Sequence, residues 1–277
     1  MPRSVPSLKV ETRRLFRDAG RAAGGALVFS LPMLMTMEMW WLGFYMDRLR
    51  LALLIALTIL LLMELSHQIG FRHTRDWRED FLDALIACGI GAAVSAIVLS
   101  VFGILGPGMS PHEIVGKVAI QTVPSAIGAL LARSQFGIGR ERIADKEETY
   151  WGELFLMAVG ALFLGFNVAP TEEMILISYS MTAWHGIGLV ALSLALMHGF
   201  VFAVGFKGGS ELSPGTPWWS AVIRFTLPGY AIAALISLYV LWTFGRADGN
   251  SVDLVVMAVI VLAFPSSIGA AAARLIL

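Results

Sequence analysis

The sequence has few charged residues and a single cysteine. Charged side chains make up 14% of its 277 residues, against about 25% in an ordinary soluble domain. Hydrophobic residues make up 57%, and the mean hydropathy is +0.75. We therefore expect a chain that lies in, and contacts, the lipid bilayer. The formal net charge of +0 argues against nucleic acid as a partner, and Cys88 has no second cysteine with which to form a disulfide.

The motifs of soluble catalytic domains are also missing. The chain has no Gly-x-x-x-x-Gly-Lys-Ser/Thr loop for phosphates, no Gly-x-Ser-x-Gly turn for a nucleophilic serine and no paired-cysteine metal motif. The longest segment between apolar runs, residues 134–150, is too short to form a hydrophobic core. We therefore expect no cofactor, no bound metal and no pumping driven by ATP.

What the sequence does contain is apolar runs of about 20 residues, each long enough to cross roughly 30 Å of hydrocarbon. Short segments of alternating polarity, as in a membrane β-barrel, do not occur. A helix satisfies its own backbone where water is absent, so the predicted fold class is all-α, a polytopic transmembrane helix bundle. The eight expected spans are 24–46, 49–71, 82–105, 113–133, 152–181, 185–206, 219–244 and 252–274.

Basic residues predict the orientation of these spans, because lysine and arginine are retained on the cytoplasmic side. They cluster before the first span, at 72–78, at 140–146 and at Lys207, while the opposite loops hold few of them. Both termini are therefore predicted to be cytoplasmic. The basic segment 1–23 precedes a long apolar stretch without a small-residue cleavage site, so the first span is expected to be retained.

The chain aligns with itself at a nearly constant offset. Glu38 falls on Glu173, and after a small insertion Pro124–Arg133 falls on Pro265–Arg274. We infer a duplicated unit of four spans. Because four is an even number, both copies have the same orientation and are related by an axis along the membrane normal. The expected division is a cytoplasmic segment at 1–23, a transmembrane repeat at 24–133, a linker at 134–151 and a second repeat at 152–277.

The last span of each repeat contains a proline. Pro124 and Pro265 are expected to kink these helices. Small residues let helix backbones approach closely in membranes, so we expect Gly128 and Gly269 to lie against a neighbouring helix.

Glutamates stand in apolar sequence at matched places of the two repeats. Glu38 is expected near the middle of the first span or slightly outward, and Glu172 with Glu173 in the fifth. An ionisable group near the bilayer centre costs about 2.5–3.5 kcal/mol on insertion scales, so it usually marks a functional pathway. We predict an ion-binding element around the pseudo-axis, formed by Glu38, Glu172, Glu173, Thr36 and Thr171. The alternative is that these glutamates only hold helices together.

Prolines precede both sets of glutamates. The stretch NVAPTEEM around Pro170 predicts a break, followed by a new helix that Thr171 caps. Pro32 precedes Glu38 in a similar way. Discontinuous helices coordinate ions in transporters, whereas a simple proline kink, which membrane helices tolerate, is the alternative.

Glu64 and His67 lie three residues apart on one face of the second span. A Glu-x-x-His motif holds metal in di-metal bundles, but these need the motif from two helices, and the second repeat has Gly199 in place of the glutamate. We favour a proton-handling pair. His198 in the sixth span is another proton-handling candidate, and a hydrogen-bonded interior histidine is its alternative.

The stretches MELSHQIGFR and NVAPTEEM, together with the layout of the spans, resemble a bacterial family of eight-span integral-membrane proteins to which no activity is assigned. The similarity covers most of the chain. It implies a multi-pass protein of the inner (plasma) membrane, and it does not imply an activity.

The stretch from Ala169 to Gly199 resembles, more narrowly, the membrane-embedded family of CAAX prenyl endopeptidases and bacteriocin-immunity proteins. In that family a Glu-Glu-x-x-x-Arg helix and a Phe-x-x-x-His helix activate water for peptide cleavage. Glu172, Glu173 and His198 match, so the resemblance implies a catalytic role for them. The arginine and the phenylalanine are replaced by aliphatic residues, which removes groups needed to bind and polarise the attacked carbonyl.

Three functions remain open from the sequence. The first and favoured one is a transport protein, a channel or a secondary transporter for a small cation or proton, because carboxylates at close quarters attract cations and titrate. The second is an intramembrane hydrolase of the prenyl-endopeptidase type, active or inactive. The third is a membrane scaffold. The axis can lie within one chain or be completed by a homo-oligomer.

Overall fold

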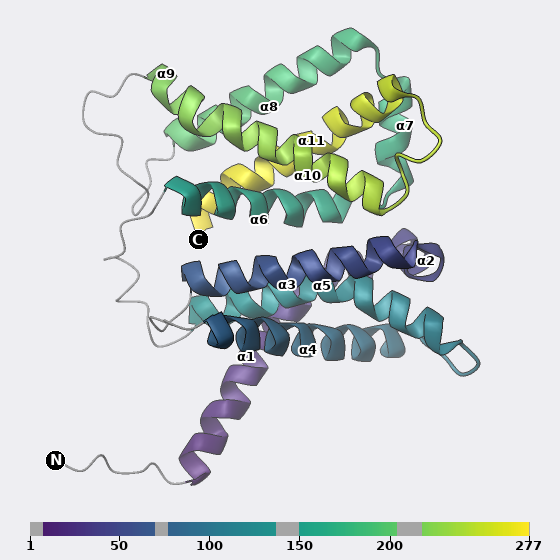
Figure 1. Cartoon of the computed structure of the whole chain (residues 1–277), viewed down its shortest axis with the longest axis vertical. Helices are drawn as coiled ribbons and strands as arrows, with labels where there is room; N and C mark the ends of the chain where they lie inside the picture. Colours follow the sequence, from purple (N-terminus) through teal and green to yellow (C-terminus); the bar gives the residue numbers. More distant parts are fainter. Residues whose placement is uncertain (1–7, 70–76, 137–149, 204–217, 277) are drawn as a thin grey trace, which may run out of the picture. The chain divides into compact units, whose positions relative to one another are not determined.

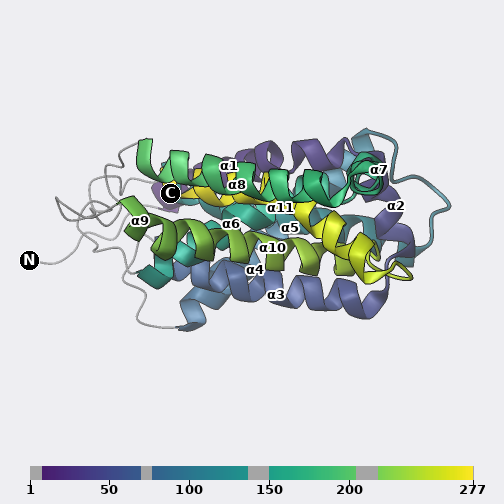
Figure 2. The ribbon, with the colours of Figure 1, turned by 90° about the horizontal axis from the view of Figure 1, so that it is seen from above.

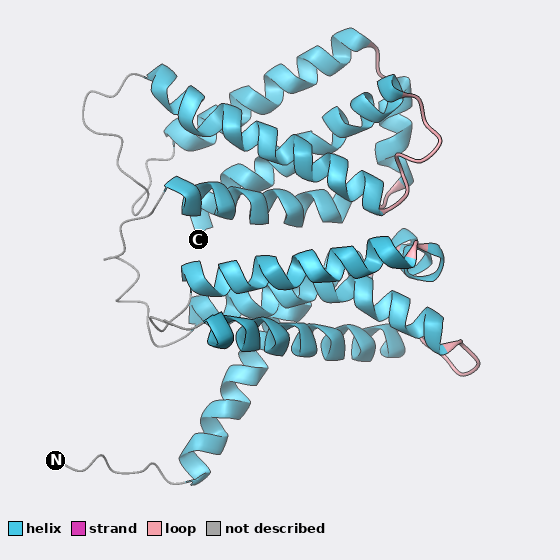
Figure 3. Cartoon of the chain, viewed as in Figure 1, coloured by secondary structure: helices cyan, strands magenta, loops and turns pink. Residues whose placement is uncertain are grey.

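The computed structural model of the chain describes residues 8–69, 77–136, 150–203 and 218–276. Within these residues the structure consists of helices joined by turns and loops, as the sequence predicts (Figure 3). The chain divides into two compact units, unit 1 at Met1–Ile143 and unit 2 at Ala144–Leu277. The division falls inside the expected linker 134–151, whose residues 137–149 lie outside the described part of the chain.

Unit 1 is built around its last helix. The helix α5 packs against α1, α4 and α2, while α3 lies against α4 and α5. In the described part of unit 1 the helices are α1 Leu8–Leu34, α2 Met37–Tyr45, α3 Arg48–Ile69, α4 Trp77–Val101 and α5 Pro111–Phe136 (Figure 1).

Unit 2 is likewise built around its last helix. The helix α11 packs against α6, α10, α8 and α7. The two units differ in the packing of one helix: α8 packs mainly against α11 and less against η2, α9 and α10, whereas α3 packs against both α4 and α5. The described helices of unit 2 are α6 Tyr150–Val168, α7 Glu172–Ser180, α8 Ala183–Ala203, α9 Trp218–Ala221, the π-helix η2 Val222–Thr226, α10 Leu227–Thr243 and α11 Val252–Ile276 (Figures 1 and 2).

Seven helices in the described residues are long and apolar enough to cross a membrane, and the bent pair α1 and α2 makes an eighth if it is counted as one span. The fifth expected span, 152–181, is broken between α6 and α7, as NVAPTEEM predicts. The first expected span, 24–46, is not continuous: α1 and α2 meet at 89° after Leu34. Pro32 lies inside α1 and does not itself end it.

The basic N-terminal segment is continuous with the first span. Because α1 begins at Leu8, the described part of segment 1–23 is helical rather than a separate tail. Residues 1–7 lie outside the described part of the chain.

Both α4 and α10 end in the same hydrogen-bonded turn. Gly103 and Gly245 each have a φ of +72°, a left-handed conformation that favours glycine. After each glycine, a backbone N–H reaches back to a buried leucine: Ile104 N donates to Leu99 O at 2.9 Å, and Arg246 N donates to Leu241 O at 2.8 Å. These bonds satisfy carbonyls that a helix end leaves free, which allows both helices to stop sharply.

Glycine contacts hold α1 to α5 and α6 to α11. A Cβ placed on Gly128 would lie 2.4 Å from the carbonyl oxygen of Gly25, and one on Gly269 would lie 2.2 Å from that of Gly160. The close approach expected of Gly128 and Gly269 is therefore confirmed. The offset that pairs Glu38 with Glu173 also pairs Gly25 with Gly160, and the inferred duplication stays a prediction.

We expect Gly128→Ala and Gly269→Ala each to lower the free energy of unfolding by about 1–3 kcal/mol, because the added methyl group forces two close-packed backbones apart. Gly89→Ala and Gly188→Ala are matched controls in α4 and α8, since a Cβ at either position has no atom within 4 Å. Chemical unfolding in detergent micelles measures the difference. Equal effects at all four positions would contradict the packing role.

Candidate functional site

The break between α1 and α2 frees backbone carbonyls, and side chains bind them. Nε2 of Gln121, on α5, donates to Met33 O at 3.0 Å. Nε1 of Trp40, on α2, donates to Leu34 O at 2.8 Å. Met33 O also accepts from Thr36 N at 3.1 Å, so Gln121 adds a second bond to that carbonyl. A buried carbonyl without a partner is costly in an apolar medium, so the bond from Trp40 to Leu34 O stabilises the right-angled turn.

The break between α6 and α7 is held by a different residue. Arg246, which follows the turn after α10, donates from Nη2 to Pro170 O. Its Nε is buried and has no hydrogen-bond partner within the described residues. Both breaks are therefore built-in features whose carbonyls are bound by side chains of the same unit.

Thr36 and Thr171 stand at the N-cap positions of α2 and α7, but neither hydroxyl caps its helix. Instead Thr36 Oγ1 donates to Pro32 O at 2.7 Å, and Thr171 Oγ1 donates to Val168 O at 2.9 Å. The expected cap at Thr171 is wrong, because the hydroxyl binds a carbonyl of the preceding helix that the break has freed.

The predicted carboxylates lie in the first turns of these short helices. Glu38 is the second residue of α2 and is partly exposed, while Glu172 and Glu173 begin α7 and are exposed. Within the described part of the chain none of the three has a hydrogen-bonded or ionic partner. Each glutamate follows a helix that is long enough to cross the membrane by itself, and not the first half of a helix broken at mid-span.

The length of those helices bears on the depth of the glutamates. The apolar part of α1, Phe16–Leu34, and the 19 residues of α6 each rise about 28 Å, enough to cross the hydrocarbon core without α2 or α7. Figures 1 and 2 show α7 lying across the end of unit 2 that is opposite to α9. Glu38 therefore follows the first long helix in the chain instead of lying within it, and its expected depth near mid-span or slightly outward stays a prediction.

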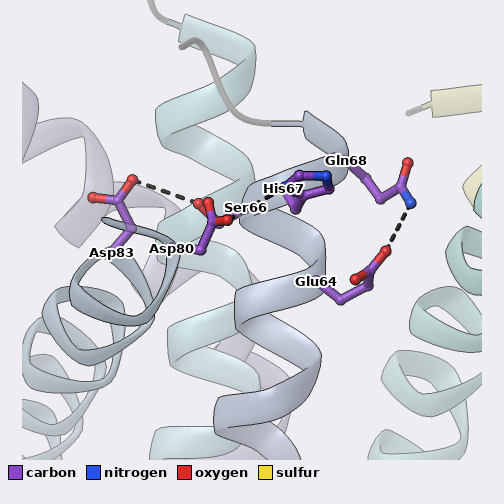
Figure 4. Close-up of polar contacts among 6 residues, drawn as sticks. All are labelled: Glu64, Ser66, His67, Gln68, Asp80 and Asp83. Carbon is purple, nitrogen blue, oxygen red and sulfur yellow. Dashed lines mark hydrogen bonds and ion pairs between the residues drawn. The ribbon is translucent and has the colours of Figure 1, made fainter. Parts of the chain in front are cut away.

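A polar cluster lies where α3 ends and α4 begins (Figure 4). Nδ1 of His67 lies 3.3 Å from Oδ2 of Asp80, whose residue is only 1% exposed. The ring of Trp77 is stacked on the imidazole with an interplanar angle of 7°. A carboxylate buried this deeply is stabilised by such a partner, and the pair joins two helices.

The expected pair of Glu64 with His67 does not form. Glu64 accepts a hydrogen bond of 2.7 Å from Nε2 of Gln68, and its side chain points away from the imidazole in Figure 4. Ser66 donates to Oδ2 of Asp83 at 3.5 Å, which adds a second link between α3 and α4. His67 is thus brought to a carboxylate, but the carboxylate belongs to another helix.

His198 occupies a similar place in unit 2. Its Nδ1 lies 3.3 Å from Oγ1 of Thr226, the last residue of the π-helix η2. A π-helix inserts an extra residue into a helix and is frequent at functional sites. The hydroxyl of Tyr150 donates to Arg224 O in the same π-turn at 3.0 Å, so this segment is tied to both α6 and α8.

Glu172 and His198 are not brought together. Glu172 lies in the short helix that precedes α8, and His198 lies 15 residues after the start of α8, which is about 22 Å of helix. A hydrolase of the prenyl-endopeptidase type needs these side chains at one water molecule. Among the described residues no group of three or more His, Cys, Asp or Glu side chains could hold a metal ion.

Sequence comparison assigns the chain to a family. Residues 18–277 match the family described as "Putative integral membrane protein (DUF2391)". The chain belongs to this family. No curated protein and no solved structure matches it.

Membership of the DUF2391 family agrees with the first resemblance found in the sequence and with a multi-span integral membrane protein in contact with lipid. The family match adds nothing to the narrower resemblance to prenyl endopeptidases. It does not assign a substrate.

A line of polar side chains on α5 was missed by the sequence reasoning. Nζ of Lys117 donates to Oε1 of Glu113 at 2.7 Å, although Lys117 is only 8% exposed. Gln121 is 1% exposed, and its Oε1 has no hydrogen-bond partner among the described residues. Oγ of Ser125 lies 2.9 Å from Oγ of Ser95 on α4. The regular spacing of four residues within an apolar span was the signal that could have found this line.

We expect Trp40→Phe to lower the free energy of unfolding by about 1–3 kcal/mol, because it keeps the ring but leaves Leu34 O without its donor. Trp41→Phe is the matched control, since Trp41 is exposed on the same helix and the structure gives it no such bond. Unfolding in detergent measures both. Equal losses in the two variants would contradict the role of the Nε1 bond at the break.

Proposed function

We propose that this protein is a transport protein, a channel or a secondary transporter, that moves protons or a small cation across the membrane. The observation that carries the proposal is the presence of two ionisable side chains, Asp80 and Lys117, on buried faces of apolar helices in unit 1. Keeping such groups away from water is costly, so they are usually found where an ion or proton passes.

The pair of His67 and Asp80 suits proton transfer. The ordinary pKa of histidine lies near neutral pH, so an imidazole can gain and lose a proton under physiological conditions. Oδ2 of Asp80 lies 3.3 Å from Nδ1 of His67, so a proton can be handed directly between the two side chains. The partly exposed ring gives the pair access to one side of the membrane.

The carboxylates at the two breaks suit the opposite side. Glu38, Glu172 and Glu173 stand at the ends of long helices, with exposed or partly exposed side chains. Negative side chains at the mouth of a pathway raise the local concentration of cations and protons. With both termini in the cytoplasm of a bacterial inner membrane, as the basic residues predict, these glutamates face outward and His67 faces inward.

The proposal predicts that Asp80→Asn lowers proton flux into proteoliposomes by about tenfold or more, because it removes the proton acceptor of the buried pair. Initial rates are measured with a pH-sensitive dye trapped in the vesicles, with the membrane potential clamped. Glu79→Gln is the matched control, since Glu79 is the exposed neighbour in the same helical turn. If vesicles that contain the unaltered protein show no proton flux, the proposal is overturned and a scaffold is favoured.

The double variant Glu38→Gln with Glu173→Gln tests the outer carboxylates. We expect it to lower the initial flux at low ionic strength. The difference in flux between this variant and the unaltered protein should shrink as salt is added, because 0.1 M salt largely screens exposed charges that lie more than about 10 Å apart. Flux that is unchanged at every salt concentration would contradict a role for these two glutamates.

A further inference from the structure

Four side chains at four-residue intervals form a polar line on α5, here called the α5 line: Glu113, Lys117, Gln121 and Ser125. It rises about 18 Å, from the first turn of the helix to the residue after Pro124. Glu113 is partly buried, and the other three are at most 8% exposed. A buried polar row of this length inside an apolar helix is costly and therefore needs a reason.

The α5 line continues on α4. Ser125 meets Ser95 at 2.9 Å, and both residues are fully buried. From Ser95 the buried face of α4 passes small residues down to Asp80, a further rise of about 22 Å. At the start of α4, Asp80 lies 3.3 Å from Nδ1 of His67 on α3. The two stretches together extend over about 40 Å, the thickness of a bilayer with its interfacial regions.

Unit 2 has the middle of this arrangement but not its outer part. Ser237 donates to Ser266 at 3.2 Å, and both are fully buried, as are Ser95 and Ser125. The alignment that places Pro124 on Pro265 places Ser125 on Ser266. The same alignment places apolar residues where α5 carries its line: Leu254 for Glu113, Ala258 for Lys117 and Leu262 for Gln121.

Other polar groups of unit 2 do not replace the α5 line. Arg246 binds Pro170 O at the break, and Glu153 and His198 lie toward the other end of the unit. Asn167 and Tyr239 have buried side-chain atoms without partners among the described residues, but these residues stand singly on α6 and α10. On α11 itself the outer half carries one charged side chain, the exposed Asp253, and no buried polar line.

We propose that the transported species is a proton, and that it crosses through unit 1 along the α5 line and the buried face of α4. This inference rests on the proposed function. Unit 2 has a similar serine pair between its helices and carries no proton path of its own.

The charges along the line favour a proton over a metal cation. Lys117 and the neighbouring Arg48, whose Nη2 is buried, both repel a metal ion, and Glu113 balances one of them. A proton can pass where a metal ion cannot: transfer from Nζ of Lys117 to Glu113 leaves a neutral amine and a neutral acid. Glu113 then releases its proton at its own end of the line, and the amine of Lys117 takes the next proton from the other side, which restores the starting charges. Hydroxyls such as those of Ser95 and Ser125 accept one proton as they release another.

The proposed proton path is closed in this structure on α4, between Ser95 and Asp80. A Cβ on Gly91 would lie 2.8 Å from the backbone nitrogen of Ala126, so α4 and α5 are packed backbone to backbone there. Passage of a proton therefore needs α4 and α5 to separate at this section. This points to gated or alternating transport rather than to an open pore.

The repeat supplies a matched test. We expect Ser125→Ala to lower proton flux into proteoliposomes by about tenfold, as loss of a buried hydrogen-bonding partner on the path, and Ser266→Ala to leave it within about twofold. Lys117→Ala, which installs the residue found at the same place in unit 2 and leaves the bonds at the α1–α2 break intact, is expected to act like Ser125→Ala. It also keeps the test valid if Ser125→Ala fails to fold, which circular dichroism and thermal unfolding would show.

The outcomes separate this inference from the proposed function. Flux by the unaltered protein no greater than that of empty vesicles would overturn both. Measurable flux that falls equally in Ser125→Ala and Ser266→Ala would overturn the assignment to unit 1 only. Replacing sodium and potassium by choline is expected to leave the dye response unchanged, and a response that requires either metal ion would overturn the proton as the transported species.

Discussion

Backbone groups inside a bilayer must find partners within the protein, and this constraint underlies each feature of the structure. It makes the apolar runs helical, and it also determines how those helices can stop. After α4 and α10, a left-handed glycine turns the last carbonyls back onto backbone N–H groups. After α1 and α6, where no such turn occurs, side chains from elsewhere in the unit bind the freed carbonyls.

The side chains that bind the freed carbonyls differ between the two units. Unit 1 uses the amide of Gln121 and the indole of Trp40, whereas unit 2 uses the guanidinium of Arg246. Two units with a similar order of helices can therefore hold their helix breaks with different polar side chains. The α5 line is one result, because a position that must be filled can be filled by a polar residue in one unit and a leucine in the other.

Local sequence patterns predicted the elements and some of their interruptions. The break at NVAPTEEM follows from Pro170, whose ring cannot continue the helix, and Gly128 and Gly269 have the small size that close helix contacts require. The break after Leu34 was not predicted, because Pro32 lies within α1 and no helix-breaking residue stands at the turn itself. At that turn Gln121, which is far away in the sequence, adds a bond to Met33 O.

Composition and periodicity by themselves determined the class of protein and the helical spans, because these depend on residues close together in the chain. Tertiary structure decided which polar groups meet. His67 was expected to pair with Glu64, three residues away, but it binds Asp80 on the next helix. Only packing brings Asp80 to His67 and Ser95 to Ser125, since helix contacts depend on which faces are buried against each other and the sequence does not state that.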